Sequence, residues 1–190
     1  FPSCQTCYGA EDTPLADNQE VDFIIGQKFL ITAHYGMVNA LNDFGKIFES
    51  EIALKHYPSE LHAGFLFYNI IRELYAGLET GLNALNDRLH LVQKKVFSHE
   101  GREVVYTLAA INRDLLDFHW VLKNHVEVLK SIELAAEELF GSGFRFYLRS
   151  ISGEYRRISS LVETNRQIFL DLRETNDSLL SLKVNETMKV

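Results

Sequence analysis

The sequence has little that points to enzymatic chemistry or to a bound metal cofactor. Only two of its 190 residues are cysteines, Cys4 and Cys7, and a structural zinc site needs a second pair of ligands. No two of its seven histidines are four residues apart, and H-E-x-x-H is absent. Phosphate-binding glycine loops and the G-x-S-x-G nucleophile motif are missing as well. We therefore predict that the chain is not an enzyme, has no catalytic residue and holds no cofactor.

A basic excess and a long apolar run are missing too. The 26 acidic residues outnumber the 19 basic ones, which gives a net charge of −7. Because phosphate binding needs a basic face, we expect no nucleic acid partner. There is no signal peptide and no apolar run of the roughly 18 residues that a membrane helix needs. The start without Met and the end inside a helical pattern at Val190 lead us to expect a piece of a longer protein.

Helix breakers are almost absent from the last 48 residues, Gly143 to Val190, which have Gly153 and no proline after Phe144. They would form one helix roughly 70 Å long, longer than a globule of this size is wide. Spacings of three and four trace a polar line along it: Arg157, Ser160, Thr164, Gln167, Asp171, Glu174, Ser178, Ser181, Asn185 and Met188. An apolar line runs beside it: Leu161, Ile168, Leu172, Leu179 and Leu182.

The two lines allow two interpretations. A plain amphipathic helix would turn its polar residues to bulk solvent. A helix that packs sideways on copies of itself would form a ring, with the polar line facing a wet axis. In such a ring, Glu174 and Asp171 would form carboxylate rings that concentrate cations, and the pattern alone leaves both interpretations open.

The rest of the chain predicts a short sheet followed by long helices. Residues 21–25 and 28–33 read as strands joined by a two-residue turn at Gly26-Gln27. A helix is expected over 38–51, with Val38, Leu41, Phe44 and Ile47/Phe48 on one face. The next begins at Pro58 and runs to Phe97. Its apolar stripe is Phe67, Ile71, Leu74, Leu78, Leu82, Leu85, Leu89, Val92 and Val96.

A break at 98–101 makes the following helix, over 102–129, the second arm of an antiparallel αα-hairpin. Its stripe is Leu108, Ile111, Leu115, Phe118, Leu122, Val126 and Leu129. A separate short helix is expected over 132–140, and Gly141-Ser-Gly143 ends it. The carboxylates Asp114, Asp117 and Glu127 share the longer helix, but no feature marks them as an acid–base pair.

The C-terminal residues resemble a known family. Ser181 to Val190 reads Ser-Leu-Lys-Val-Asn-Glu-Thr-Met-Lys-Val. This resembles the stretch that enters the first transmembrane helix of the CorA family of divalent-cation channels, where the pattern is N-x-x-N-E-x-M-K-V. Further matches are Tyr147-Leu-Arg149, Val126-Glu-Val-Leu129 and the hairpin from Val21 to His34. The resemblance covers about residues 20–190.

The resemblance implies a homopentamer at the cytoplasmic face of the cell (inner) membrane. A funnel of αβα sandwich and acidic αα-hairpin would precede a stalk helix that enters the membrane, and the transmembrane helices and Gly-Met-Asn loop would lie outside this chain. The ion carried would be Mg²⁺, often also Co²⁺ or Ni²⁺, and Zn²⁺ in the ZntB relatives. The predicted pore-lining residues are Glu174, Ser178, Ser181, Asn185 and Met188.

The chain departs from the family at the sensor. In Mg²⁺-gated members, acidic residues hold Mg²⁺ between neighbouring subunits, whereas here the corresponding positions are Arg72 and Ser150. A cation and one hydroxyl are poor ligands for a hard divalent ion, which prefers several oxygens. We therefore interpret Arg72 and Ser150 as degenerate metal-sensor positions, or as positions where Arg72 replaces the ion by pairing with a neighbour's carboxylate.

The predicted fold class is mainly α (α+β), with the β-hairpin as the remnant of an αβα sandwich. Residues 1–57 would be the partial sandwich (hairpin 21–34 and one helix), 58–142 an αα-hairpin of willow-type helices, and 143–190 the stalk. The predicted function is the cytoplasmic part of a CorA-like magnesium/cobalt transporter. Two alternatives stay open: a ZntB-like zinc transporter, although the stalk from Phe144 on has no His or Cys, and a soluble helical oligomerisation scaffold.

Overall fold

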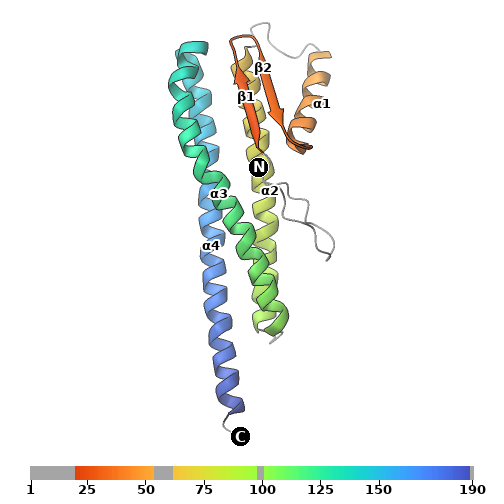
Figure 1. The fold of residues 1–190 in the computed structure, drawn as a ribbon, viewed down its shortest axis with the longest axis vertical. Helices are drawn as coiled ribbons and strands as arrows, with labels where there is room; N and C mark the ends of the chain where they lie inside the picture. The colour runs from red at the N-terminus through yellow and green to blue at the C-terminus, as the bar shows by residue number, and fades with distance from the viewer. Residues whose placement is uncertain (1–19, 54–61, 98–100, 189–190) are drawn as a thin grey trace. The chain divides into compact units, whose positions relative to one another are not determined.

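The computed structural model describes residues 20–53, 62–97 and 101–188, and it is a mainly helical fold with one small sheet, as predicted (Figure 1). Cys4, Cys7, the helix start at Pro58 and the centre of the break at 98–101 lie outside the described residues. The elements are β1 (Val21–Ile25), β2 (Leu30–His34), α1 (Asn39–Ala53), α2 (Ala63–Phe97), α3 (Gly101–Phe140), a 3₁₀ turn (Ser142–Phe144) and α4 (Arg145–Thr187).

The chain divides into two compact units. The first contains Phe1–Glu79 and Val121–Ile158, and the second contains Thr80–Trp120 and Ser159–Val190. The boundary falls inside α2, α3 and α4, so each long helix contributes one part to each unit. The predicted division at residues 57 and 142 stays a prediction.

In the first unit, β1 and β2 pair antiparallel from Val21 opposite His34 to Ile25 opposite Leu30. The predicted two-residue turn is wrong, because this register leaves the four residues 26–29 in the loop. Gly26 N–H donates to the Phe29 carbonyl at 2.9 Å and closes the loop. A side chain at Gly26 would meet the Phe29 ring, since an added Cβ would lie 2.4 Å from its Cε1. Close approach therefore accounts for the glycine.

The hairpin packs on the beginning of α2. The rings of Phe23 and Phe67 meet edge to face with centroids 5.3 Å apart, and Ala63 N–H donates to the Gln27 carbonyl at 3.3 Å. On the apolar face predicted for residues 38–51, Val38, which directly precedes α1, is buried, whereas Ile47 is 52% exposed. The rings of Phe44 and Phe48 stack 5.8 Å apart.

Aromatic rings fill the space where α2 begins and α3 gives way to α4. The Phe144 ring lies 4.9 Å from Phe140, 5.5 Å from Tyr147 and 5.7 Å from His62. Gly64 leaves room for them, since an added Cβ would lie 2.8 Å from the Phe144 ring. Gly141, with φ of 81°, ends α3 in the left-handed region that favours glycine.

The predicted break between residues 129 and 132 is also wrong, because α3 is one helix of 40 residues. No glycine or proline interrupts this stretch. The Ser131 hydroxyl donates to the Val128 carbonyl at 2.8 Å, within the helix itself. A serine that bonds back to its own helix satisfies its polar group without ending the helix.

The core of the second unit is formed by aliphatic stripes. The predicted stripes of α2 and α3 are buried in this unit, as expected. Two ion pairs join the helices at their edges: Arg88 to Asp114 at 2.5 Å, and Lys95 to Glu103. The buried residues are Leu82, Leu85, Leu89, Val92 and Val96 of α2, and Val104, Leu108, Ile111, Leu115 and Phe118 of α3.

Candidate functional site: an exposed polar line on α4

The beginning of α4 is anchored in the first unit by four buried side chains: Phe144, Leu148, Ile151 and Ile158. Because Gly153 is its only glycine and it has no proline, the helix continues without interruption to Thr187. The predicted long C-terminal helix is therefore confirmed.

Every member of the predicted polar line is exposed. Arg157 belongs to the first unit, where its guanidinium pairs with the carboxylates of Glu79 and Glu154. Its hydrogen bonds hold the pKa of the Glu79 carboxyl below the ordinary value. The remaining members, from Ser160 to Met188, belong to the second unit and form one exposed strip along the helix.

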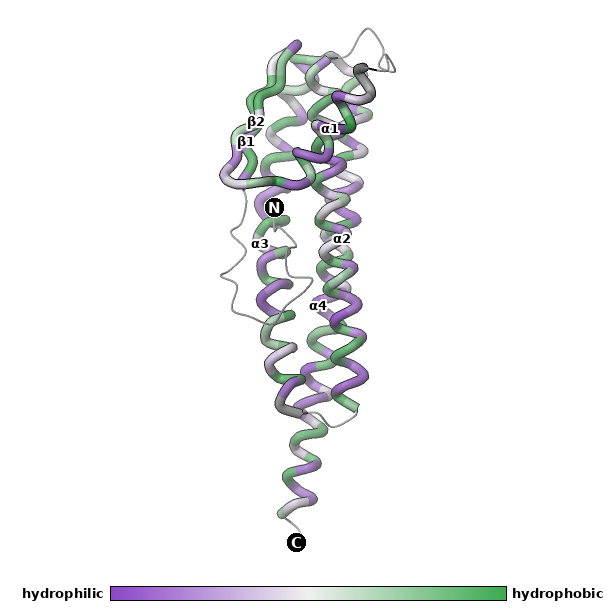
Figure 2. Tube along the Cα trace, turned by 90° about the vertical axis from the view of Figure 1, so that its right-hand side faces the viewer, coloured by the Kyte–Doolittle hydropathy of each residue, from purple (hydrophilic) through white to green (hydrophobic). Residues whose placement is uncertain are grey.

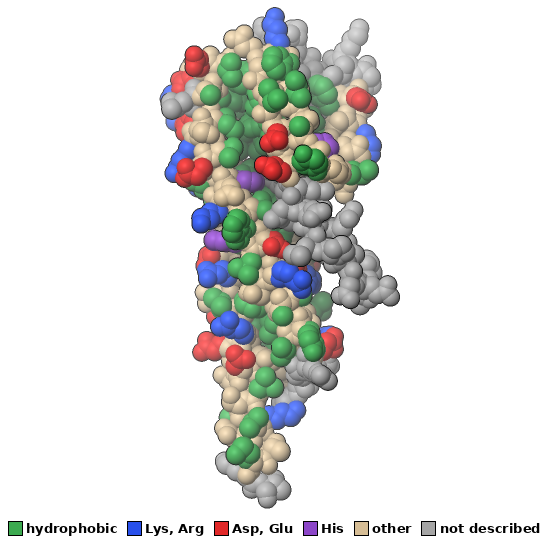
Figure 3. Space-filling model, in the orientation of Figure 1, with side chains coloured by type: hydrophobic (Ala, Val, Ile, Leu, Met, Phe, Trp, Pro, Cys, Tyr) green, Lys and Arg blue, Asp and Glu red, His purple; other side chains and the backbone are tan. Residues whose placement is uncertain are grey.

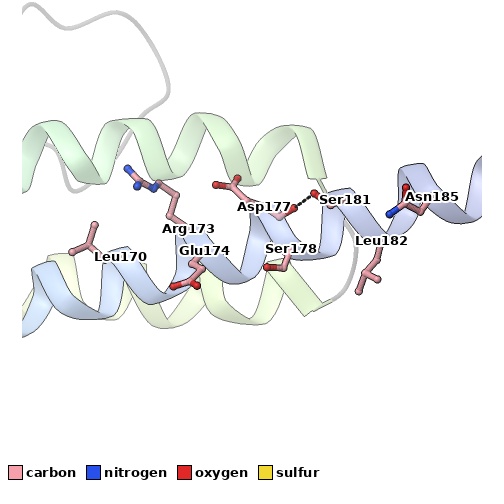
Figure 4. A pocket seen from close by; sticks show the side chains of 8 residues that line it. All are labelled: Leu170, Arg173, Glu174, Asp177, Ser178, Ser181, Leu182 and Asn185. Carbon is pink, nitrogen blue, oxygen red and sulfur yellow. Dashed lines mark hydrogen bonds between the residues drawn. The ribbon is translucent and has the colours of Figure 1, made fainter.

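Four of the five predicted pore-lining residues lie around one open groove of about 710 Å³ (Figure 4). They are Glu174, Ser178, Ser181 and Asn185. The remaining lining residues are Leu170, Arg173, Asp177 and Leu182, all on α4. The fifth predicted residue, Met188, is not part of the groove lining and is 79% exposed.

Polar groups along the strip are engaged locally or stay open to solvent. Ser181 Oγ donates to the Asp177 carbonyl at 2.9 Å, and Gln167 Nε2 donates to Asp171 Oδ1 at 2.8 Å. In the described part of the chain, the Glu174 carboxylate forms no ion pair. The strip thus offers carboxylate, hydroxyl and amide oxygens, the ligand types that hard cations prefer.

Most of the predicted apolar line lies beside the buried face of α4 and is only half-buried. Leu172 is buried, Leu161, Ile168 and Leu179 are half-buried, and Leu182 is exposed. The line that is buried in the second unit shares only Leu172 with the predicted one: Val162, Asn165, Phe169, Leu172 and Asn176. Sequence reasoning missed this line because it contains two asparagines, although its spacing of three and four residues is the signal of a packed helix face.

The last turns of α4 continue beyond the end of α2 and the start of α3 in the second unit (Figure 2). Every described side chain from Leu180 to Met188 is exposed. Leu182 is 59% and Val184 is 56% exposed. In Figure 3 this end shows hydrophobic side chains among uncharged polar groups and backbone, with a Lys or Arg side chain beside them. Exposed aliphatic side chains beside a polar strip are typical of a surface that other protein covers.

The two degenerate sensor positions both contact Tyr68, a residue that sequence reasoning did not single out. In the first unit, the Tyr68 hydroxyl lies 3.2 Å from Ser150 Oγ, within hydrogen-bonding distance. The Arg72 guanidinium lies over the Tyr68 ring, 5.5 Å from its centroid. The Tyr147 ring also meets Tyr68 edge to face at 4.9 Å. No carboxylate is part of these contacts.

Two further pairs of titratable groups are buried or half-buried. In the first unit, Tyr75 Oη and His125 Nδ1 are 3.1 Å apart. Burial lowers the pKa of His125 to about 4 and raises that of Tyr75. In the second unit, burial and then the Asp114 charge raise the pKa of Asp117. Nowhere in the described residues do three His, Cys, Asp or Glu side chains gather as a metal site would need.

Among the described helices, none has a stretch long and apolar enough to cross a bilayer. Within its units the protein is a bundle of long helices with a small hairpin, and its last helix carries an exposed polar strip. The family model described as "CorA-like Mg2+ transporter protein" matches residues 4–190. The chain therefore belongs to the CorA-like Mg²⁺ transporter family.

Comparisons with individual proteins agree with this assignment. The chain is 22% identical over 166 residues to the cobalt/magnesium transport protein CorA of Methanocaldococcus jannaschii, covering 87% of this chain and 52% of that protein. It also matches the complete structure of the CorA magnesium transporter from the same organism with a TM-score of 0.73 and 18% identity. That match covers 91% of this chain and 59% of the solved chain. The chain thus spans about half the length of its curated relative.

Proposed function

We propose that this chain is the part of a CorA-like transporter for Mg²⁺ or Co²⁺ that precedes its membrane segments. The observation that supports this most directly is the exposed polar strip of α4, uninterrupted from Ser160 to Met188. The family is described by Mg²⁺ transport, and the relative from M. jannaschii by transport of cobalt and magnesium. In this proposal the divalent ion is cargo, and the protein carries out no covalent chemistry.

The proposed ion path runs along the axis of a ring of α4 helices. At 100° per residue, Leu182 and Val184 stand roughly 80° to either side of the line through Glu174, Ser178, Ser181 and Asn185. Each helix could therefore contact one neighbour through Leu182 and the other through Val184, a head-to-tail arrangement that closes into a ring. The family resemblance implies five copies, so the proposed partner is the chain itself.

In such a ring, repeated side chains would act on a passing ion. Five Glu174 carboxylates would concentrate divalent cations at one level of the axis. The Asn185 amides would offer neutral oxygens further along, and Met188 would form an apolar collar. We place this ring at the cytoplasmic face of the cell (inner) membrane, with the membrane anchor in segments that follow Val190.

We also propose that Arg72 and Ser150 do not bind a regulatory Mg²⁺. The Ser150 hydroxyl is hydrogen-bonded to Tyr68, and the Arg72 guanidinium lies over the Tyr68 ring. The positive charge of Arg72 disfavours the binding of a second cation at this place. The test is limited proteolysis of the full-length protein during Mg²⁺ titration. We expect no protection up to millimolar Mg²⁺, and protection in that range would contradict the proposal.

Transport itself is best tested in cells that lack their own magnesium uptake and carry the full-length gene. We expect the gene to restore growth at low Mg²⁺. Glu174→Lys should reduce uptake at least tenfold, because it converts the proposed carboxylate ring into a ring of positive charges that repels the cation. The matched control is Glu138→Lys, which changes an exposed carboxylate of α3 and so lies off the polar strip of α4, and uptake should stay near wild type.

Equal effects of the two substitutions would contradict the path along this strip. Uptake of zinc in place of magnesium and cobalt would favour the ZntB-like alternative. A full-length protein that assembles but carries no ion would favour the helical scaffold.

A further inference from the structure

A buried amide lies within the face that α4 packs into the second unit. Asn165 is 3% exposed and sits between Val162 and Phe169 in the buried line. Its Nδ2 donates to the Leu82 carbonyl of α2 at 3.1 Å, and its Oδ1 accepts from Asn86 Nδ2 at 2.7 Å. Both ends of this amide are therefore satisfied by α2.

Within the second unit, the apolar side chains around the amide do not by themselves select one axial position of α4. The buried residues of α2 here are leucines and valines repeated at spacings of three and four, from Leu82 to Val96. Sliding α4 by one helical turn, roughly 5.4 Å, would place Val162 or Phe169 against similar aliphatic neighbours. A repetitive apolar seam accepts more than one register unless a polar residue selects one.

Asn165 makes such a slide unfavourable. One turn towards the start of α2, Leu82 would take the place of Asn86, so Asn165 Oδ1 would lose the donor that Asn86 supplies. A buried amide that loses a partner is disfavoured, so this slipped register is penalised at one residue. The side chain of Asn176, buried on the same face three turns later, has no hydrogen-bond partner among the described residues.

We propose that Asn165 and Asn86 form a register lock between α4 and α2. Asn165 is a positioning residue in this role, because it sets how far the exposed end of α4 extends beyond α2 and α3. A buried asparagine of this kind specifies one arrangement at a cost in stability. The inference concerns the second unit alone and does not depend on the transport proposal.

The lock can be tested by measuring distances between two spin labels in the full chain. Cys4 and Cys7 are changed to serine, and labelled cysteines replace Asn83 of α2 and Arg173 of α4, both exposed. The parent should show one narrow distance distribution. Asn165→Leu should add a second population displaced by roughly 5 Å, one helical turn, while its thermal midpoint stays equal or rises.

The matched control is Asn176→Leu, which removes the other buried amide of the same face and should keep one distance. Asn86→Leu removes one of the two partners and should give a smaller second population than Asn165→Leu. A single unchanged distance in Asn165→Leu would overturn the proposal, because packing alone would then fix the register. Equal second populations in Asn165→Leu and Asn176→Leu, or loss of helical circular dichroism in Asn165→Leu, would overturn it as well.

Discussion

The first unit adds a cluster of aromatic rings to its buried aliphatic side chains, whereas the second packs mainly around repeated aliphatic side chains. In the first, Phe144 contacts Phe140, Tyr147 and His62, each at its own angle and distance. In the second, leucine and valine recur every three or four residues. Rings of different shape fit in few ways, but similar aliphatic residues fit in several. The comparison teaches that differently shaped rings favour one fit in the first unit, whereas in the second unit the buried Asn165–Asn86 contact adds the selection that similar aliphatic side chains lack.

The largest expected effect comes from removing a central ring of the first unit. Phe144→Ala should lower the free energy of unfolding by about 3–5 kcal/mol, because it deletes a buried ring and leaves a cavity. Urea unfolding followed by circular dichroism measures this change. Phe146→Ala is the control, because Phe146 is 74% exposed and its loss should cost less than about 0.5 kcal/mol. Similar costs for both would mean that the ring cluster does not stabilise the unit.

The corresponding change in the second unit is Leu89→Ala. Leu89 has no exposed surface, and its truncation should cost about 3 kcal/mol by the same urea measurement. The control is Leu91→Ala, two residues along α2 and 58% exposed. A cost for Leu89 close to that for Leu91 would show that the aliphatic core closes around the cavity, unlike the aromatic one.

Acid should weaken the first unit through His125. Its folded pKa of about 4 lies below the ordinary 6.5, so the unfolded chain binds the proton more readily. The contribution of His125 to the free energy of unfolding is full above pH 6.5. It declines by about 2–3 kcal/mol as the pH falls towards 4. Thermal unfolding across this range measures it. His125→Gln should flatten the dependence, whereas the exposed control His119→Gln should leave it unchanged; equal pH profiles for all three proteins would exclude His125 as the source.

The smallest effect is expected at the surface of the first unit. Arg157→Gln removes the ion pairs with Glu79 and Glu154, and exposed pairs contribute about 0–1 kcal/mol. A thermal melt at low and at 1 M salt is the measurement, and the difference from wild type should shrink with salt. A larger loss that salt does not change would indicate that the Arg157 alkyl chain stabilises by packing.

Periodicity predicted the long helices and most of their buried residues from the sequence. The stripes of α2 and α3 and the exposure of the α4 polar line follow from side-chain spacing, because a helix buries one face. The hairpin loop was mispredicted because the close approach of the Phe29 ring, rather than a tight turn, requires Gly26. The break before residue 132 was mispredicted because Ser131 bonds within its own helix and so does not end it.

The candidate site was predicted only in part. The spacing of Glu174, Ser178, Ser181 and Asn185 placed them on one face, and they do line one groove. Asn165 was missed because a polar residue is expected at the surface unless its hydrogen-bond partner is known. That partner, Asn86, is 79 residues away in the sequence, and helix periodicity carries no information about contacts between distant residues. The Tyr68–Ser150 contact, between residues 82 apart, was missed for the same reason. The Tyr68–Arg72 contact spans only four residues of α2, so helix spacing could have predicted it.

Gly64 shows how the aromatic core of the first unit constrains protein engineering. Alanine is favoured over glycine inside helices by about 1 kcal/mol, so a design based on propensity would replace this residue of α2. An added methyl group would lie 2.8 Å from the Phe144 ring and 2.9 Å from the Phe140 ring. Replacing glycine by alanine should therefore stabilise the protein at Gly77, where an added Cβ meets nothing within 4 Å. The same replacement should destabilise it at Gly64.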